Sequence, residues 1–117
     1  MKADPAGMYI LICSDADMCN NTKESALKVA TDRLKNGAWP LYMRTRNRRH
    51  ITQGDECLIY LAGSGHLAQH IFATAKVAEK RNRRSSETVD SQDLLVNPPD
   101  QVLELRDIVL IEPIPIR

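Results

Sequence analysis

The fold of this chain is decided between residues 54 and 62, where the sequence is Gly54-Asp55-Glu56-Cys57-Leu58-Ile59-Tyr60-Leu61-Ala62. The glycine and aspartate are typical of a turn, and the apolar run that follows them predicts a strand. A short glycine loop at 63–66 separates this strand from a second run of strand-forming residues, Ile71–Glu79. The two runs are expected to pair as an antiparallel hairpin at the centre of a sheet.

The N-terminal part predicts one more strand and the main helix. Tyr9–Cys13 is a short, continuous apolar run, which is typical of a strand buried on both faces. Apolar residues then recur at helical spacing, with Asn21 as their cap, so a helix is expected at about 22–36. The segment 39–43 behind the helix is expected to be extended.

The C-terminal part predicts a long connection and a closing strand. Residues at about 80–100 form a polar insertion, and 102–111 form the last strand. The alternation slips at Arg106-Asp107, which predicts a β-bulge. Pro113 and Pro115 are expected to end the pairing, because proline lacks a backbone N–H.

These elements predict a single α+β domain over residues 1–117, a curved sheet or small barrel of about five to six mostly antiparallel strands with one main helix. The chain has no apolar stretch near the ~20 residues that a membrane span needs. It opens without a signal peptide and contains three cysteines, an odd number that makes a disulfide framework improbable. A cytoplasmic protein without a membrane partner is therefore expected.

The charge of the chain is small in total but uneven along the sequence. The formal net charge is +1, yet residues 44–84 carry nine cations against three anions, and an acidic tail follows. Guanidinium groups match phosphate oxygens in geometry and charge, which predicts a nucleic-acid-binding surface. The alternative is a solvated face that the acidic tail partly neutralises. The candidate phosphate-binding residues are Arg44, Arg46, Arg48, Arg49, Lys80, Arg81, Arg83 and Arg84.

The single tryptophan, Trp39, lies shortly before the first arginine group. Such a residue can be a platform on which a nucleic-acid base stacks, or a core residue packed against the helix. Tyr42 allows a similar choice, between a second wall of a base pocket and a residue on the surface of the sheet. The sequence leaves both alternatives open.

Residues with catalytic or metal-binding chemistry form no recognisable motif. His66 and His70 have the spacing of a helical metal site, but they lie where a loop enters a strand. Gly63-Ser64-Gly65 fits neither a nucleophile elbow nor a phosphate-binding loop. The three cysteines are expected to be small core residues. We therefore predict a non-catalytic protein with no cofactor and no metal.

The order of these parts resembles the EVE family of the PUA-like superfamily, which is related to the YTH and ASCH domains. The resemblance rests on Gly54–Leu61, on Ile71–Glu79, and on Val102–Ile108 followed by Pro113, and it spans most of residues 8–115. It implies a PUA-like pseudobarrel with a pocket for a flipped, often modified, base. Carried onto this chain, it implies Trp39 as the pocket wall and Ser14 as a polar contact.

The predicted function is thus a non-catalytic nucleic-acid-binding module. Its arginine-rich surface would hold DNA or RNA phosphates, and a pocket of Trp39, Ser14 and Tyr42 would recognise a modified or flipped base. A separate effector protein could supply any activity. The alternative is a small-molecule or protein-interaction domain that uses the same barrel pocket.

Overall fold

The predicted hairpin lies at the centre of the sheet. The computed structural model describes residues 7–17, 23–42, 45, 48–63, 65–84, 99 and 101–116. Strand β5 (Glu56–Leu61) pairs antiparallel with β6 (His70–Asn82), which confirms the hairpin. β6 continues three residues beyond its predicted end, so the polar segment that was expected from about residue 80 begins only after Asn82.

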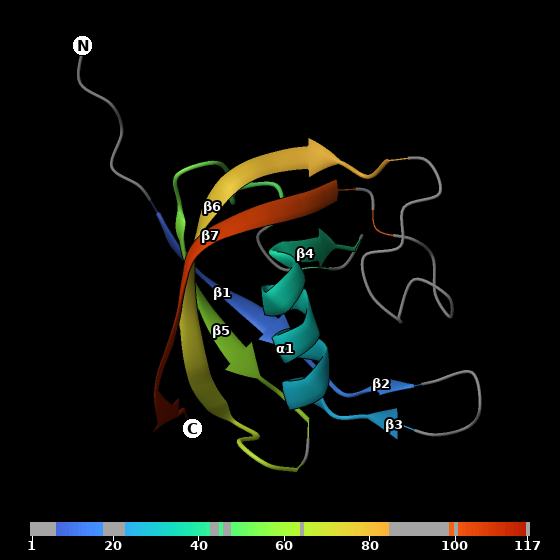
Figure 1. Cartoon of the computed structure of the whole chain (residues 1–117), viewed down its shortest axis with the longest axis vertical. Helices are drawn as coiled ribbons and strands as arrows, with labels where there is room; N and C mark the ends of the chain where they lie inside the picture. Colours follow the sequence, from blue (N-terminus) through green and yellow to red (C-terminus); the bar gives the residue numbers. More distant parts are fainter. Residues whose placement is uncertain are drawn as a thin grey trace.

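Three more strands complete a five-stranded sheet of order β1-β5-β6-β7-β4 (Figure 1). β1 (Met8–Cys13) runs parallel to β5, whereas β7 (Gln101–Pro115) is antiparallel to both β6 and β4 (Ala38–Leu41). Within the described residues β1 and β4 remain the two edges of this sheet, so it does not close into a barrel. With its one described helix the chain has the predicted α+β architecture.

The helix α1 (Ala26–Asn36) begins four residues later than predicted. Ser25 is its N-cap, and the hydroxyl oxygen of Ser25 accepts a hydrogen bond from the backbone N–H of Lys28 at 3.2 Å. The preceding residues, β3 (Lys23–Glu24), are extended because they pair with β2 (Ala16–Asp17) in a small separate ribbon. Pairing between the two short strands therefore replaces the expected first helical turn.

Both ends of α1 are held by further polar contacts. At the start, Asp15 Oδ1 accepts a hydrogen bond from the backbone N–H of Ala26 at 2.9 Å. At the end, Gly37 takes a left-handed conformation with φ of 65°, and its N–H bonds the last carbonyls of the helix. Asn21, the predicted cap, lies outside the described residues. The helix is thus fixed to the end of β1 through Asp15.

The hydrophobic core lies between α1 and one face of the sheet, which we call the inner face (Figure 1). Helix residues Val29 and Ala30 are almost completely buried against it. β1 and β5 contribute alternate residues, as expected when one face is covered, whereas β4, β6 and β7 also contain consecutive buried residues. Large core side chains from the sheet include Leu11, Trp39, Leu41, Ile59, Leu61, Phe72 and Leu103.

The Gly54-Asp55 turn fixes the register between β1 and β5. Gly54 has φ of 91°, a conformation that side-chain-bearing residues seldom adopt. The buried Asp55 carboxylate accepts hydrogen bonds from the backbone N–H groups of Gly7, at 2.9 Å, and Thr52, at 2.8 Å. Both oxygens are thereby satisfied, and the start of β1 is held beside the start of β5.

Strand β7 contains the predicted bulge. Asp107 has φ of 53°, and the pairing with β6 shifts register beside it, between Thr74 and Lys76. An aspartate tolerates this conformation better than most residues, which explains why the irregularity falls there. The bulge turns consecutive side chains of β7 to new directions just where the sheet bends.

The prediction that Pro113 and Pro115 end the pairing is wrong, because β7 extends to Pro115. The backbone N–H of Ile116 donates to the carbonyl of Gln69 at 2.8 Å, so even-numbered residues here face β6. The two proline nitrogens therefore face the opposite edge of β7. Beyond Leu105, no described strand pairs with that edge, so the missing N–H groups break no ladder.

Candidate nucleic-acid interface

Two basic segments that are far apart in the sequence meet at the end of β6. The ammonium group of Lys80 donates a hydrogen bond to the backbone carbonyl of Arg48 at 2.6 Å. This contact joins the turn at 48–50 to the last residues of β6. We call the resulting group the basic cluster; it consists of Arg48, Arg49, Lys80, Arg81, Arg83 and Arg84. Arg44 and Arg46 lie outside the described residues.

The turn that carries Arg48 and Arg49 is held on both sides. Before it, the N–H of Arg48 donates to the carbonyl of Thr45 at 3.4 Å. After it, Ile51 is fully buried in the core, and Thr52 bonds to the Asp55 carboxylate. The backbone of the turn is therefore anchored to the sheet, while Arg49 is exposed.

Acidic side chains lie close to the basic cluster. The guanidinium of Arg81 pairs with the carboxylate of Glu104 at 2.7 Å, and the Arg81 side chain is only 15% exposed. Glu79 stands opposite Glu104 in the register of β6 and β7. Arg81 is thus partly neutralised, and Arg49 and Arg84 are the exposed arginines of the cluster.

Arg83 has an unusual environment. Its Nε atom is buried and has no hydrogen-bond partner within the described part of the chain. A buried donor without a partner costs about 1–3 kcal/mol, more when it belongs to a charged group. A bound anion would supply the missing acceptor and remove that cost.

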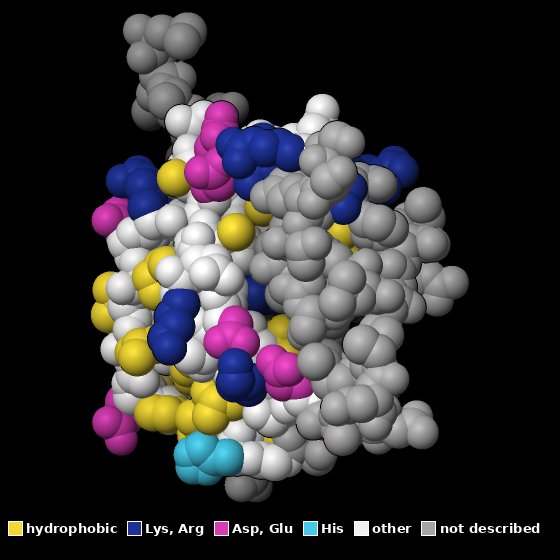
Figure 2. Space-filling view, turned by 45° about the vertical axis from the view of Figure 1, so that its right-hand side comes forward, with side chains coloured by type: hydrophobic (Ala, Val, Ile, Leu, Met, Phe, Trp, Pro, Cys, Tyr) yellow, Lys and Arg dark blue, Asp and Glu magenta, His cyan; other side chains and the backbone are white. Residues whose placement is uncertain are grey.

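The space-filling view shows Lys and Arg side chains together at the upper end of the molecule, beside acidic side chains (Figure 2). This is the end of the molecule at which β6 ends and β7 begins (Figure 1). Neighbouring cations repel one another, and the repulsion is relieved when a polyanion binds. The arrangement can therefore hold phosphate groups, although it carries no information about base sequence.

Trp39 does not form the wall of an open pocket. The indole is 1% exposed, and the guanidinium of Arg33, itself buried, lies 4.8 Å from the ring centroid. A base needs an exposed ring face for stacking, and this ring has none. Trp39 is therefore the core residue of the two alternatives, packed between its strand and α1.

The other two pocket residues occupy different places. Ser14 is exposed at the end of β1, and Tyr42 is half-buried just after β4. These strands form opposite edges of the sheet. The backbone N–H of Tyr42 donates to the Thr45 hydroxyl at 2.8 Å, which is a structural contact in the turn.

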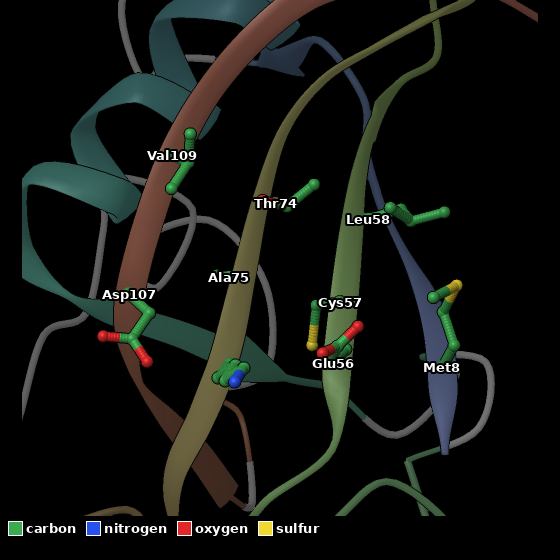
Figure 3. Close-up of a pocket in the computed structure, with 9 residues that line it drawn as sticks. Met8, Glu56, Cys57, Leu58, Thr74, Ala75, Asp107 and Val109 are labelled. Atoms are coloured by element: carbon green, nitrogen blue, oxygen red, sulfur yellow. The ribbon is translucent and has the colours of Figure 1, made fainter. Parts of the chain in front are cut away.

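Two hollows lie elsewhere on the molecule. One, of about 380 Å³, lies between α1 and β7, and its apolar lining includes Leu27, Phe72 and Leu110. The other, of about 340 Å³, lies on the face of the sheet opposite α1, with Leu58 and Val109 in its lining (Figure 3). Neither is lined by Trp39, Ser14 or Tyr42.

Within the part of the chain that the structure describes, the cysteines and other candidate metal ligands do not come together in one site. Cys13 and Cys57 are buried, as predicted, and Cys19 lies outside the described residues. Burial, together with the nearby Asp55 carboxylate, raises the pKa of the Cys57 thiol to about 12. Among the described residues, no three His, Cys, Asp or Glu side chains lie close enough to hold a metal ion.

Comparison with known proteins adds nothing to this geometry. No protein-family model, curated protein or solved structure matches the chain. The resemblance to the EVE family therefore stays a prediction from the order of the sequence motifs. Among the described residues, no helix has both the length and the apolar character required to cross a membrane.

The sequence analysis did not predict two features, although a pattern in the sequence indicates each of them. Arg33 follows Ala26 and Ala30 at helical spacing, which places a charged residue on the apolar side of α1 beside Trp39. The outward side of β1 is apolar as well as its inward side, a pattern that predicts burial on both faces. In the structure, that outward side is exposed.

Proposed function

We propose that this chain is a non-catalytic nucleic-acid-binding module that holds phosphate groups with its basic cluster. The observation that carries the proposal is the hydrogen bond from Lys80 to the carbonyl of Arg48, which joins the two basic segments at one end of the sheet. The unpartnered Nε of Arg83 supports it, because a phosphate oxygen is a suitable acceptor. The proposal assigns no base stacking to Trp39, whose ring is buried.

The proposal includes the family assignment. The order of the Gly54-Asp55 turn, the hairpin and the closing strand supports membership of the EVE family, and with it an architecture related to the PUA-like pseudobarrel. A cytoplasmic location and a separate effector protein that acts on the bound nucleic acid belong to the same proposal. DNA and RNA both present the phosphates that the cluster requires.

A binding experiment tests the proposal. Fluorescence anisotropy of labelled single-stranded RNA, single-stranded DNA and duplex DNA would be measured at several salt concentrations. For the wild type, affinity should fall steeply with salt, because each neutralised phosphate releases counterions. The double variant Arg49→Ala/Arg84→Ala should bind about 10- to 100-fold more weakly, with a salt slope smaller by about 2.

The matched control is Lys28→Ala/Lys35→Ala, which removes the same charge from the exposed side of α1. It should retain most of the wild-type affinity and salt slope. Equal losses in both double variants would show that bulk charge alone causes binding, and would contradict a site at the basic cluster. Absence of salt-dependent binding to any of the three ligands would refute the function itself.

A second candidate function, binding of a small apolar molecule, is favoured by the hollow between α1 and β7. Its lining residues Leu27 and Leu110 leave an apolar space of about 380 Å³ open at the surface. Such a space suits a compact hydrophobic ligand. Binding of a hydrophobic dye that ignores salt and is lost in Leu110→Asp would favour this function.

A further inference from the structure

The face of the sheet opposite α1, which we call the outer face, is apolar over several strands. The strand registers place Ile10, Leu58, Thr74 and Val109 side by side across β1, β5, β6 and β7. Figure 3 shows Leu58, Thr74 and Val109 on three adjacent strands, with Met8 on the fourth. Leu58, Thr74 and Val109 line the hollow of about 340 Å³, and Ile10 continues the same row onto β1.

Apolar side chains of the outer face are exposed to an unusual degree. Met8 is 62% exposed, Ile10 is 44% exposed and Val109 is 53% exposed. A sheet with one solvent-facing side normally carries polar residues there, and a strand that is apolar on both sides is typical of a sheet covered on both sides. β1 has the second pattern, but α1 covers only its inner side. The outer face therefore has the composition of a surface that another body covers.

The charges beside this row identify what can cover it. Three of the described charged residues line the hollow. Glu56 and Lys76 are direct cross-strand neighbours in β5 and β6, whereas Asp107 forms an ion pair with Arg106 within β7 at 3.3 Å. A carboxylate and an ammonium side by side form a pattern that is complementary to itself. A twofold axis that lies above the outer face, parallel to the strands and midway between β5 and β6, exchanges these two positions between the two copies.

We propose that the outer face is a homodimer interface, and that a second copy of this chain packs its own outer face against it about that axis. Glu56 of each copy then faces Lys76 of the other, so the ion pair forms twice. In the neighbouring row, Ile10 of each copy faces Val109 of the other, and Leu58 faces Thr74. Such a contact is isologous, as a twofold axis requires.

The size of the face suits a small dimer. Two sheets that pack face to face lie about 10 Å apart with strands nearly aligned, which this axis produces. About a dozen partly exposed side chains on four strands provide on the order of 600 Å² per copy, at the lower end of the range for specific interfaces. An unrelated apolar surface would desolvate Glu56 and Lys76 without supplying either with a counter-charge across the contact, which disfavours such a partner.

Sedimentation velocity of the full chain, from low micromolar to several hundred micromolar, tests the proposal without nucleic acid. Its outcome is thus independent of the proposed function. The wild type should shift from monomer to dimer as concentration rises. Ile10→Lys should weaken dimerisation at least tenfold, because it buries a charge in each half of the interface. Leu110→Lys is the matched control, since Leu110 is exposed but lines the hollow beside α1, and it should leave the dimer unchanged.

Charge reversal gives the more specific test. Glu56→Lys and Lys76→Glu should each weaken the dimer about tenfold, because each places like charges opposite one another. The double variant Glu56→Lys/Lys76→Glu should restore the dimer to within a few-fold of the wild type. Circular dichroism would verify that each variant is folded, and these exchanges lie on the surface.

Three results would overturn the proposal. The first is a wild type that stays monomeric at every concentration. The second is a dimer that responds to Leu110→Lys as strongly as to Ile10→Lys, since the interface would then lie elsewhere. The third is a double charge reversal that dimerises no better than the single variants, since the two charges would then not face each other across the twofold axis.

Discussion

The two faces of the sheet are built from neighbouring residues of the same strands, yet they have opposite environments. In β1, Leu11 is 2% exposed on the inner face, whereas Ile10 is 44% exposed on the outer face. In β5, Cys57 and Leu58 show the same alternation, buried and half-buried. The hydrophobicity of the side chains does not distinguish the inner-face residues from the outer-face residues. The position of α1 distinguishes them, because α1 covers only the inner face. Burial of a residue on a sheet therefore depends on what packs over its face.

The largest expected contrast between the faces concerns thiol reactivity. At pH 8 the Cys57 thiol should react with iodoacetamide on the order of a thousand times more slowly than a free cysteine, because its pKa of about 12 leaves almost no thiolate. A cysteine placed on the outer face, in Ile10→Cys, should react at nearly the ordinary rate in dilute protein. Peptide mapping by mass spectrometry measures both rates in one sample. Similar rates at the two positions would show that the inner face opens readily.

The same thiol predicts a pH dependence of stability. Its pKa is raised from 9.0 to about 12, so between these values the unfolded chain releases the proton and the folded chain keeps it. The contribution is fully present below pH 9 and is lost as the pH rises toward 12, so the free energy of unfolding should decrease over that range. Urea titrations of the wild type and of Cys57→Ala would measure it. The Cys57→Ala variant should show the shallower decrease, and parallel curves would contradict the prediction.

A matched pair of truncations on β1 measures the energetic difference between the faces. Leu11→Ala should lower the free energy of unfolding by about 2–5 kcal/mol, because it leaves a cavity in the core. Ile10→Ala, one residue earlier, should cost less than about 1 kcal/mol in dilute protein, because its side chain is half in water. Chemical denaturation of both variants provides the comparison. Equal losses would mean that the outer face is covered within a single chain.

The smallest expected effect concerns the helix that covers the inner face. Ser25→Ala removes the hydroxyl that accepts the Lys28 N–H and should destabilise the protein by about 1 kcal/mol. Ser25→Asp should keep most of the stability, since a carboxylate can accept the same hydrogen bond. Thermal unfolding of the three proteins would reveal the order. If Ser25→Asp lost as much as Ser25→Ala, the cap would not contribute as the structure indicates.

Local sequence signals predicted the hairpin and the bulge correctly. The Gly54-Asp55 turn, the two strand-forming runs and the slip at Asp107 are all decided by nearest neighbours along the chain. The start of α1 was missed because Lys23–Glu24 pairs with a strand outside the helix. The two prolines of β7 were misjudged because their effect depends on which edge of the strand has a neighbour.

The candidate site was predictable only in part. The density of arginines identified the segment 80–84, but the contact that joins Lys80 to Arg48 arises from folding across 32 residues. The burial of Trp39 depends in part on Arg33, which lies on α1 and covers the indole ring. A sequence pattern cannot show whether a side chain from another element will cover an aromatic ring or leave it exposed for stacking. Whether β1 is buried on one face or two depends in the same way on the number of bodies that pack against it.

The prolines at the end of β7 also limit how folded molecules can join into fibres. Pro113 and Pro115 present nitrogens without hydrogens to the edge of that strand with which no described strand pairs. An incoming strand would therefore find two successive donor positions empty, and a continuous ladder could not form. Growth of an extended intermolecular sheet is blocked at this end, although its neighbouring side chains are apolar.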